Sequence, residues 1–237
     1  MTNLILAAIF FLGIHLFVAG TPLRGVLVQR LGRGVYMAFF SVASIAGIVW
    51  LAMAYNQAAI SPDNVMLPGF PLPAWFAHLG ALIMLIAFLF AFIGLTTPSP
   101  TAVGSEGVLD KPEPVRGILR ITRHPFLWGV LIWAAFHFLA NGDLAASVMF
   151  GMFVILTAAG TWSIDNKRRR ALGEKWDSFS ARTSNVPFAA ILAGKQGLRL
   201  GEIAWWQWLG ALAAFGLLFY FHMALFGVSP VPQWSPY

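Results

Sequence analysis

The stretch that decides the fold is LAASVMFGMFVILTAAGTWS, residues 144–163, which contains 20 residues and no charged side chain. A helix needs roughly 20 apolar residues to cross the hydrocarbon core of a bilayer. This stretch therefore predicts a transmembrane helix. The basic run Lys167–Arg170 follows almost at once, and basic residues are typical of the cytoplasmic end of a span.

The composition of the whole chain agrees with a membrane protein. Of the 237 residues 59% are hydrophobic and only 10% are charged, and the mean hydropathy is +0.75. Charged residues make up about a quarter of an ordinary soluble domain. The composition thus excludes a disordered chain and a water-soluble enzyme. The chain also has no cysteine, which excludes disulfides, thiolate metal ligands and a cysteine nucleophile.

Five further stretches are long and apolar. We predict an all-α fold, a polytopic membrane helical bundle of six transmembrane helices that forms one integral membrane domain over residues 1–237. The predicted spans are residues 4–20, 35–55, 74–95, 126–140, 144–163 and 203–226. The fourth is short for a span, so it would borrow residues 118–125 or lie obliquely.

The basic residues predict the orientation of this bundle. All 15 Lys and Arg residues fall in three loops, which follow the first, third and fifth spans. With six spans these loops share one face, and the enrichment of Lys and Arg in cytoplasmic loops makes that face cytoplasmic. Both termini would then lie on the outer, periplasmic side of a bacterial inner membrane. The net charge of +6 is thus an orientation signal. Nucleic-acid binding is not expected, because no patch interleaves aromatic with basic residues.

The five histidines are the only strong ligand or proton-transfer groups that this topology places in the spans or at their ends. Ionisable groups at such positions are costly and therefore candidates for function. Depth along the predicted helices separates an inner pair, His15 and His124, from an outer trio, His78, His137 and His222. His124 and His137 are 13 residues apart, or about 20 Å along a helix, so one metal ion cannot serve both sets.

The inner pair suits haem iron. Two imidazoles with no thiolate or carboxylate at the same depth match a metal that already carries its equatorial ligands, whereas zinc needs three or four ligands in all. We therefore hypothesise a haem between His15 and His124, with Arg24, Arg120 or Arg123 pairing with its propionates. The alternative is that the histidines bond neighbouring helices and the arginines reach out to the membrane surface.

Three local predictions follow from the same residues. Pro125 favours the first position of a helix, which makes His124 the N-cap residue. The outer trio forms either a second site, for another haem, a quinone or a proton relay, or packing contacts to backbone carbonyls. Residues 165–179 are expected to continue the fifth helix into water, with Trp176 and Phe179 at the bilayer surface.

Three stretches carry a resemblance to a known family. They are FLGIHLFVAGTPLRGVLVQRLG at residues 11–32, GILRITRHPFLWG at residues 117–129, and residues 162–188 with Asp165 and TSNVPF. Together they resemble the NnrU family of bacterial membrane proteins, which is similar to the plant and cyanobacterial zeta-carotene isomerase.

The resemblance implies a haem b between His15 and His124, with His137 as a tuning or substrate-side residue. It also implies a redox-gated cis–trans isomerisation of an apolar polyene within the membrane lipids. A thiolate ligand used by the isomerase would have no counterpart here, because the chain has no cysteine.

Two other functions stay open on the sequence. The first is non-enzymatic: the protein would sense or carry haem or nitric oxide, or help a respiratory denitrification protein to mature, as the family's association with nitric-oxide and nitrite reduction indicates. The second is methyl transfer, because Arg123-His124-Pro125 with Gly129 resembles a motif of membrane methyltransferases that bind S-adenosylmethionine. Those enzymes carry an acidic pair after the next span, whereas residues 164–167 hold only Asp165, which counts against methyl transfer.

Overall fold

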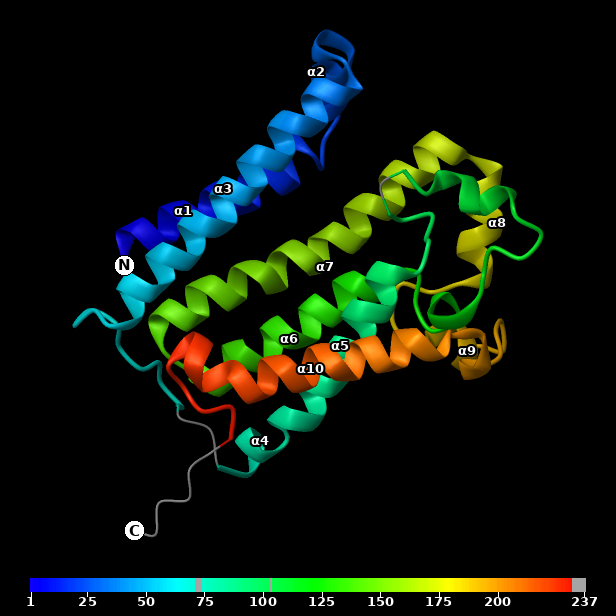
Figure 1. The fold of residues 1–237 in the computed structure, drawn as a ribbon. Coiled ribbons are helices and arrows are strands. Elements are labelled where there is room, and N and C mark those ends of the chain that lie inside the picture. The colour runs from blue at the N-terminus through cyan, green and yellow to red at the C-terminus, as the bar shows by residue number, and fades with distance from the viewer. Residues whose placement is uncertain (71–73, 103, 232–237) are drawn as a thin grey trace. The chain divides into compact units, whose positions relative to one another are not determined.

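The computed structural model describes residues 1–70, 74–102 and 104–231, and this part of the chain is mostly helical and contains no strand (Figure 1). The helices are α1 (Thr2–Gly13), α2 (Leu23–Leu31), α3 (Arg33–Ala59), α4 (Ala74–His78), α5 (Gly80–Thr96), α6 (Pro125–Asn141), α7 (Leu144–Leu172), α8 (Glu174–Arg182), α9 (Ala189–Leu192) and α10 (Trp205–Phe226). A π-helical turn, η1 (Ile14–Val18), extends α1, and 3-10 turns occur at η2 (Glu106–Asp110), η3 (Gly117–Arg120) and η4 (Leu200–Glu202).

The predicted all-α fold is confirmed, while the number of spans stays a prediction. Each of the six predicted spans coincides largely with helix. Helices α3, α7 and α10 are long and apolar enough to cross a membrane, and α1–η1 with α2, bent by 80°, makes a fourth candidate. Helices α5 and α6 have 17 residues each, fewer than a span usually needs. By length and composition, three to four of the described helices are membrane-spanning candidates.

The chain forms two compact units, each with its own core. Unit 1 comprises Met1–Leu72 and Ala134–Ser163, and unit 2 comprises Pro73–Trp133 and Ile164–Tyr237. Two of the three boundaries fall within α6 and α7, so each of these helices contributes residues to both units, and the third lies between residues 72 and 73. The sequence alone predicted one domain, and two of the boundaries lie inside continuous helices, where no linker marks a division.

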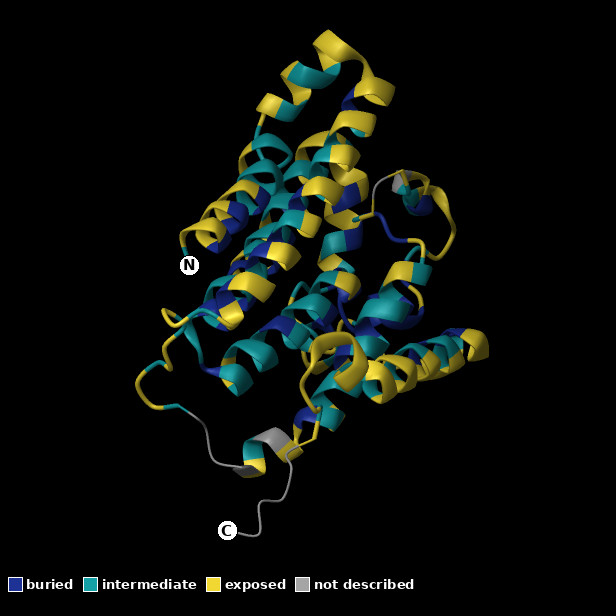
Figure 2. Ribbon diagram, turned by 60° about the vertical axis from the view of Figure 1, so that its left-hand side comes forward, coloured by how far each residue is buried: buried dark blue, intermediate teal, exposed yellow. Residues whose placement is uncertain are grey.

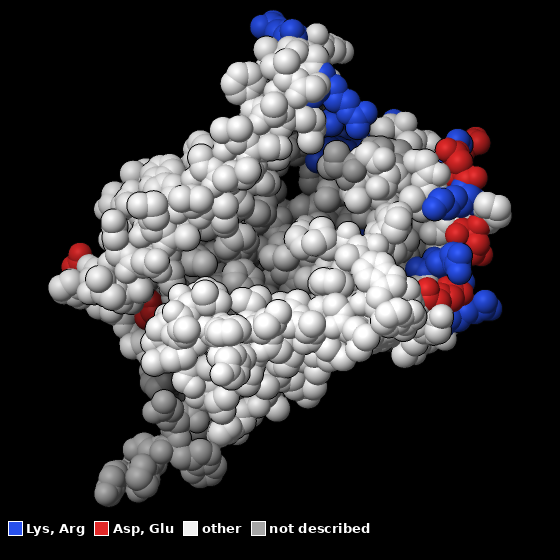
Figure 3. Space-filling view, in the orientation of Figure 1, with Lys and Arg blue, Asp and Glu red and all other residues white. Residues whose placement is uncertain are grey.

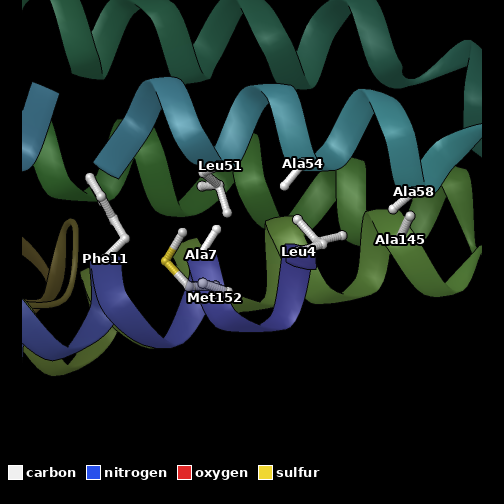
Figure 4. Packing of buried hydrophobic residues seen from close by; sticks show 9 residues of the cluster. Leu4, Ala7, Phe11, Leu51, Ala54, Ala58, Ala145 and Met152 are labelled. Atoms are coloured by element: carbon white, nitrogen blue, oxygen red, sulfur yellow. The ribbon is translucent and has the colours of Figure 1, made fainter. Parts of the chain in front are cut away.

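The core of unit 1 forms where α1 packs on α3 and α7. Leu4 and Ala7 of α1 and Leu51 and Ala54 of α3 are at most 1% exposed. Figure 4 shows their side chains directed toward one another, together with Met152 of α7. Alanines at this contact let the helix backbones approach closely, which is a common way to pack helices in membranes.

The long helices α3 and α10 also have exposed residues along their length (Figure 2), and many of these are apolar. On α3, Phe39 and Val42 are 68% and 66% exposed, and on α10, Trp205 and Leu209 are 74% and 56% exposed. Apolar surface of this extent is rare on a soluble monomer. The apolar helices therefore indicate a membrane protein.

Within unit 2, α5 and α6 touch at two glycines. A Cβ atom on Gly129 of α6 would lie 2.5 Å from the backbone nitrogen of Ala91 and 2.7 Å from the carbonyl oxygen of Ala87. A Cβ on Gly94 of α5 would meet the backbone nitrogen of Phe126. Because backbone atoms cannot move aside as a side chain can, both positions require glycine. This contact holds the first turn of α6, and with it His124, against α5.

One prediction for unit 2 was partly wrong. Helix α7 does continue beyond the apolar stretch, but it ends at Leu172, and α8 begins after Gly173, whose φ is +51°. Trp176 and Phe179 do not lie at a surface: they are 0% and 2% exposed and pack with Val115. The helix period places both aromatic rings on one face of α8, and the irregular segment before η3 covers that face.

The basic side chains of each unit gather at one end. In Figure 3 the Lys and Arg atoms of unit 1 lie over α2, and those of unit 2 alternate with acidic atoms over α8 and its neighbouring turns. Two of the pairs in unit 2 are Lys175 with Asp110 at 2.6 Å and Arg182 with Glu113 at 2.7 Å. Such exposed pairs contribute little to stability.

A third pair in unit 2 is sheltered. The Nε and Nη2 atoms of Arg120 donate to the two carboxylate oxygens of Glu202 at 2.8 and 3.0 Å. The backbone N–H of Gly117 adds a third hydrogen bond, at 2.8 Å. The guanidinium and this N–H lower the pKa of Glu202 to about 2. The pair therefore fastens η3 to η4, directly before α10.

We predict that Glu202→Gln lowers the stability of the folded protein by about 2 to 3 kcal/mol at neutral pH, because a carboxyl whose folded pKa is about 2 instead of 4.5 favours the folded state. This contribution is complete above the ordinary pKa and is lost as the pH falls toward 2. Thermal unfolding in detergent between about pH 6 and about pH 3 measures it.

The matched control is Asp110→Asn, which breaks a pair whose side chains are 61% and 64% exposed. It should change the unfolding temperature little at any pH. The account of the Arg120–Glu202 pair fails if both variants lose the same stability, or if the Glu202→Gln variant keeps the full acid sensitivity of the native protein.

Candidate functional site

His15 lies in the π-helical turn η1 of unit 1. Single π-helical turns occur frequently at functional sites. The Nδ1 atom of His15 lies 2.7 Å from the carbonyl oxygen of Phe11. A carbonyl oxygen can only accept, so Nδ1 carries the proton, and the lone pair of the neutral ring is on Nε2. The rings of Phe11 and Phe40 lie 4.4 and 5.3 Å from the imidazole, centroid to centroid, and hold its plane.

Gly20 stabilises the backbone that carries His15. A Cβ at this position would collide with the carbonyl group of Leu16, so only glycine lets the chain turn directly after η1. The Gly20 carbonyl also accepts a hydrogen bond from Ser163 Oγ at 3.3 Å, and Thr21 Oγ1 donates to the Phe17 carbonyl at 2.5 Å. These contacts explain why a small residue and a hydroxyl follow the histidine within residues 11–32.

Arg24 is the predicted arginine of unit 1. Its guanidinium carbon lies 5.7 Å from the centroid of the Tyr36 ring, a cation–π distance. Among the described residues Arg24 forms no ion pair, and the buried Tyr36 hydroxyl has no hydrogen-bond partner. An unsatisfied buried hydroxyl beside an unneutralised cation is the kind of place where an anionic group is accommodated.

His124 belongs to a buried cluster in unit 2. Its side chain is 1% exposed, and its Nε2 atom lies 2.7 Å from Asp165 Oδ1. Arg123 donates from Nε to both oxygens of the same carboxylate, at 3.0 and 2.9 Å, and also from Nη2. Burial lowers the pKa of the His124 imidazole, and its hydrogen bond to Asp165 opposes that shift.

The backbone around this cluster is joined to a distant segment. Arg123 N donates to the Ser184 carbonyl at 3.0 Å, and Phe188 N donates to the Ile121 carbonyl at 2.8 Å. Thr122 Oγ1 donates to the Asn185 carbonyl at 2.5 Å. Phe188 reaches this position with φ = +65°, which is strained for an aromatic residue. The segment TSNVPF thus holds the Arg-His-Pro turn in place.

The prediction that His124 is the N-cap of a helix is confirmed. Helix α6 begins at Pro125, and Trp128 N donates to the His124 carbonyl at 3.0 Å. The backbone N–H of His124 donates in turn to Thr122 Oγ1 at 3.2 Å. The turn places the His124 ring against Asp165 of α7.

The three predicted propionate partners differ in what they already bind. Arg120 is paired with Glu202 and also donates from Nη1 to Gln196 Oε1 at 2.5 Å. Arg123 is paired with Asp165. Of the three, only Arg24 is without a carboxylate partner in the part of the chain that the structure describes. An anion at Arg120 or Arg123 would have to displace an existing ion pair.

The outer histidines have separate environments. His137 stacks on Phe150 at 4.9 Å, and His222 Nδ1 lies 2.8 Å from the Val228 carbonyl. His78 is the last residue of α4. Residues 1–70, 74–102 and 104–231 contain no group of three or more His, Asp or Glu side chains that could hold a metal ion.

Asp165 belongs to this site but was not among the residues predicted from the sequence. It lies 41 and 42 residues from its two partners, so no local spacing connects them. The sequence feature that could have indicated it is a carboxylate directly after the uncharged stretch of residues 144–163. Since Asp165 bonds to both Arg123 and His124, the one acid that the methyltransferase comparison retained is occupied within the protein.

Comparison with known proteins assigns the chain to a family. The model of the NnrU protein family matches residues 3–230. The chain belongs to the NnrU family. It is also similar to the chloroplastic 15-cis-zeta-carotene isomerase of Arabidopsis thaliana, with 35% identity over 117 residues, and to that of Zea mays, with 34% identity over 116 residues. No solved structure matches the chain.

These matches confirm the predicted resemblance and define its extent. Each covers 48% of this chain and 30% of the relative. The chain therefore spans well under half the length of either isomerase, and the activity of the whole plant enzymes is not transferred to it by similarity alone.

Proposed function

We propose that this NnrU-family protein is a membrane-embedded haem b protein that catalyses cis–trans isomerisation of an apolar polyene. The observation that carries the proposal is the 35% identity with a 15-cis-zeta-carotene isomerase over nearly half of the chain. The apolar exposed helices support a substrate that reaches the protein through the lipid phase.

His15 and His124 are the residues that would hold the haem iron in this proposal. His15 has the features of a metal-binding histidine, since one ring nitrogen is anchored to a carbonyl and the other is left with its lone pair. His124 is buried and rigid, and its anchored nitrogen is Nε2. Both residues thus offer one nitrogen donor to iron. A bound haem would supply a redox-sensitive Lewis acid to the site.

The other residues of the site have supporting roles in this proposal. Arg24 pairs with a propionate, because it is the arginine of the three whose charge is not already neutralised by a carboxylate. Phe11 and Phe40 keep water from His15 and orient its ring. His137, stacked on Phe150, is assigned to the substrate side.

The proposal includes the topology inferred from charge. Six spans would place the loops that contain all Lys and Arg residues in the cytoplasm and both termini outside, in a bacterial inner membrane. The short helices α5 and α6 would then cross obliquely or with the help of flanking turns.

We predict that the protein purified in detergent has the visible spectrum of a six-coordinate haem b, and that His15→Ala or His124→Ala removes or shifts its Soret band. Each substitution deletes one axial nitrogen. His222→Ala is the matched control, because that histidine bonds a carbonyl near the end of α10 and should leave the spectrum unchanged. A colourless protein that haemin does not reconstitute refutes the haem assignment, as does an unaltered spectrum in both ligand variants.

We predict that the reduced protein converts 15-cis-zeta-carotene to its trans isomer in liposomes, and that the oxidised protein and the His15→Ala variant do not. Liquid chromatography of the extracted carotenes measures the conversion. A haem-loaded, reduced protein that leaves the carotene unchanged contradicts the isomerase assignment. If that protein binds nitric oxide without turnover, the non-catalytic function is favoured in its place.

A further inference from the structure

The carboxylate of Asp165 is a hydrogen-bond acceptor on both of its oxygens. Arg123 approaches it from Nε and Nη2, and His124 approaches it from Nε2. A guanidinium is always charged, so the carboxylate beside it is ionised and has no proton to donate. The hydrogen in the 2.7 Å contact between His124 and Asp165 must therefore belong to the imidazole.

This assignment decides where the lone pair of His124 lies. A neutral imidazole has one protonated and one unprotonated nitrogen. Since Nε2 carries the proton, Nδ1 carries the lone pair. No hydrogen bond to Nδ1 of His124 is present among the described residues. His15 is held the opposite way, because the Phe11 carbonyl takes its Nδ1 proton and leaves Nε2 unprotonated.

We infer that Asp165 is a positioning residue, which fixes His124 as the Nε2–H tautomer and leaves the lone pair of the neutral ring on Nδ1. The same carboxylate also holds the ring plane, since its other contacts fix it to Arg123, whose backbone is bonded to Ser184. The 1% exposure of the His124 side chain leaves no water to compete for the bond.

The inference has a specific consequence that rests on the proposed function. If His15 and His124 hold a haem, they do so through different ring nitrogens, Nε2 and Nδ1 respectively. The carboxylate on His124 makes its imidazole a stronger electron donor, as partners of metal-bound histidines do. Asp165 would then favour the oxidised state of the bound iron.

The tautomer can be tested without haem. The experiment is 15N nuclear magnetic resonance of haem-free protein labelled at histidine, in detergent at about pH 8.5, which is about two units above the ordinary histidine pKa. The signal missing in His124→Gln identifies His124, and the signal missing in His15→Gln identifies His15. We expect Nε2–H for His124 and Nδ1–H for His15. Nδ1–H for His124 in the unsubstituted protein overturns the inference.

Two variants separate positioning from general stability. Asp165→Asn, whose amide both donates and accepts, should let both tautomers of His124 appear, whereas Arg123→Gln, which breaks the same buried ion pair, should keep Nε2–H. Asp177→Asn is the surface control, because its carboxylate is 61% exposed. An unchanged His124 signal in Asp165→Asn contradicts the inference. If that variant does not fold, the tautomer of the unsubstituted protein decides alone.

A second readout applies if haem binds. The reduction potential of the Asp165→Asn variant should become more positive than that of the Asp177→Asn control, because the axial histidine loses its anionic partner. An equal potential in both contradicts the role of Asp165 toward haem. A protein that binds no haem refutes the proposed function but leaves the tautomer result intact, so the two failures are distinguishable.

Discussion

The carboxylate of Asp165 holds together three parts of unit 2 that are distant in sequence. It accepts hydrogen bonds from Arg123 and His124, and Arg123 is bonded in turn through its backbone to Ser184. A buried charge is costly unless it is paired and hydrogen-bonded on all sides. Here the guanidinium of Arg123 and the imidazole of His124 both donate hydrogen bonds to the carboxylate. The turn before α6 must therefore keep both side chains directed at Asp165. The geometry of His124 follows from that requirement.

Two of the stretches that carried the family resemblance, residues 117–129 and 162–188, meet within unit 2. The Arg-His-Pro turn pairs with the segment around Ser184, and Asp165 joins it from the end of α7. In unit 1, residues 11–32 form a π-helical turn with His15, which Gly20 permits because a larger residue would strike Leu16. Each histidine thus has one ring nitrogen fixed by an acceptor. For His15 the acceptor is the Phe11 carbonyl, and for His124 it is the Asp165 carboxylate.

The long helices were predictable because each contains a long apolar run, and such a run needs no information about its neighbours. Helix α6 begins at Pro125, as predicted, because the fixed φ of proline suits the first position of a helix. The burial of Trp176 was not predictable, because it depends on a covering segment about 60 residues earlier, near Val115. The contact of Asp165 with His124 joins residues 41 positions apart in the chain, so no local pattern predicted it. The tautomer of each histidine depends on one acceptor atom, which is the Phe11 carbonyl oxygen for His15 and an Asp165 carboxylate oxygen for His124. The sequence therefore yielded candidate histidines but not the contacts that hold them.

The central claim is that Asp165 and Arg123 act as one unit that organises the His124 turn, and a double-mutant cycle tests it most directly. Unfolding free energies would be measured in one detergent for the native protein, Arg123→Gln, Asp165→Asn and the double variant. Because each single variant leaves a buried partner unpaired, we predict a coupling energy above about 2 kcal/mol. If the two single effects simply add to give that of the double variant, the side chains act independently and the claim is wrong.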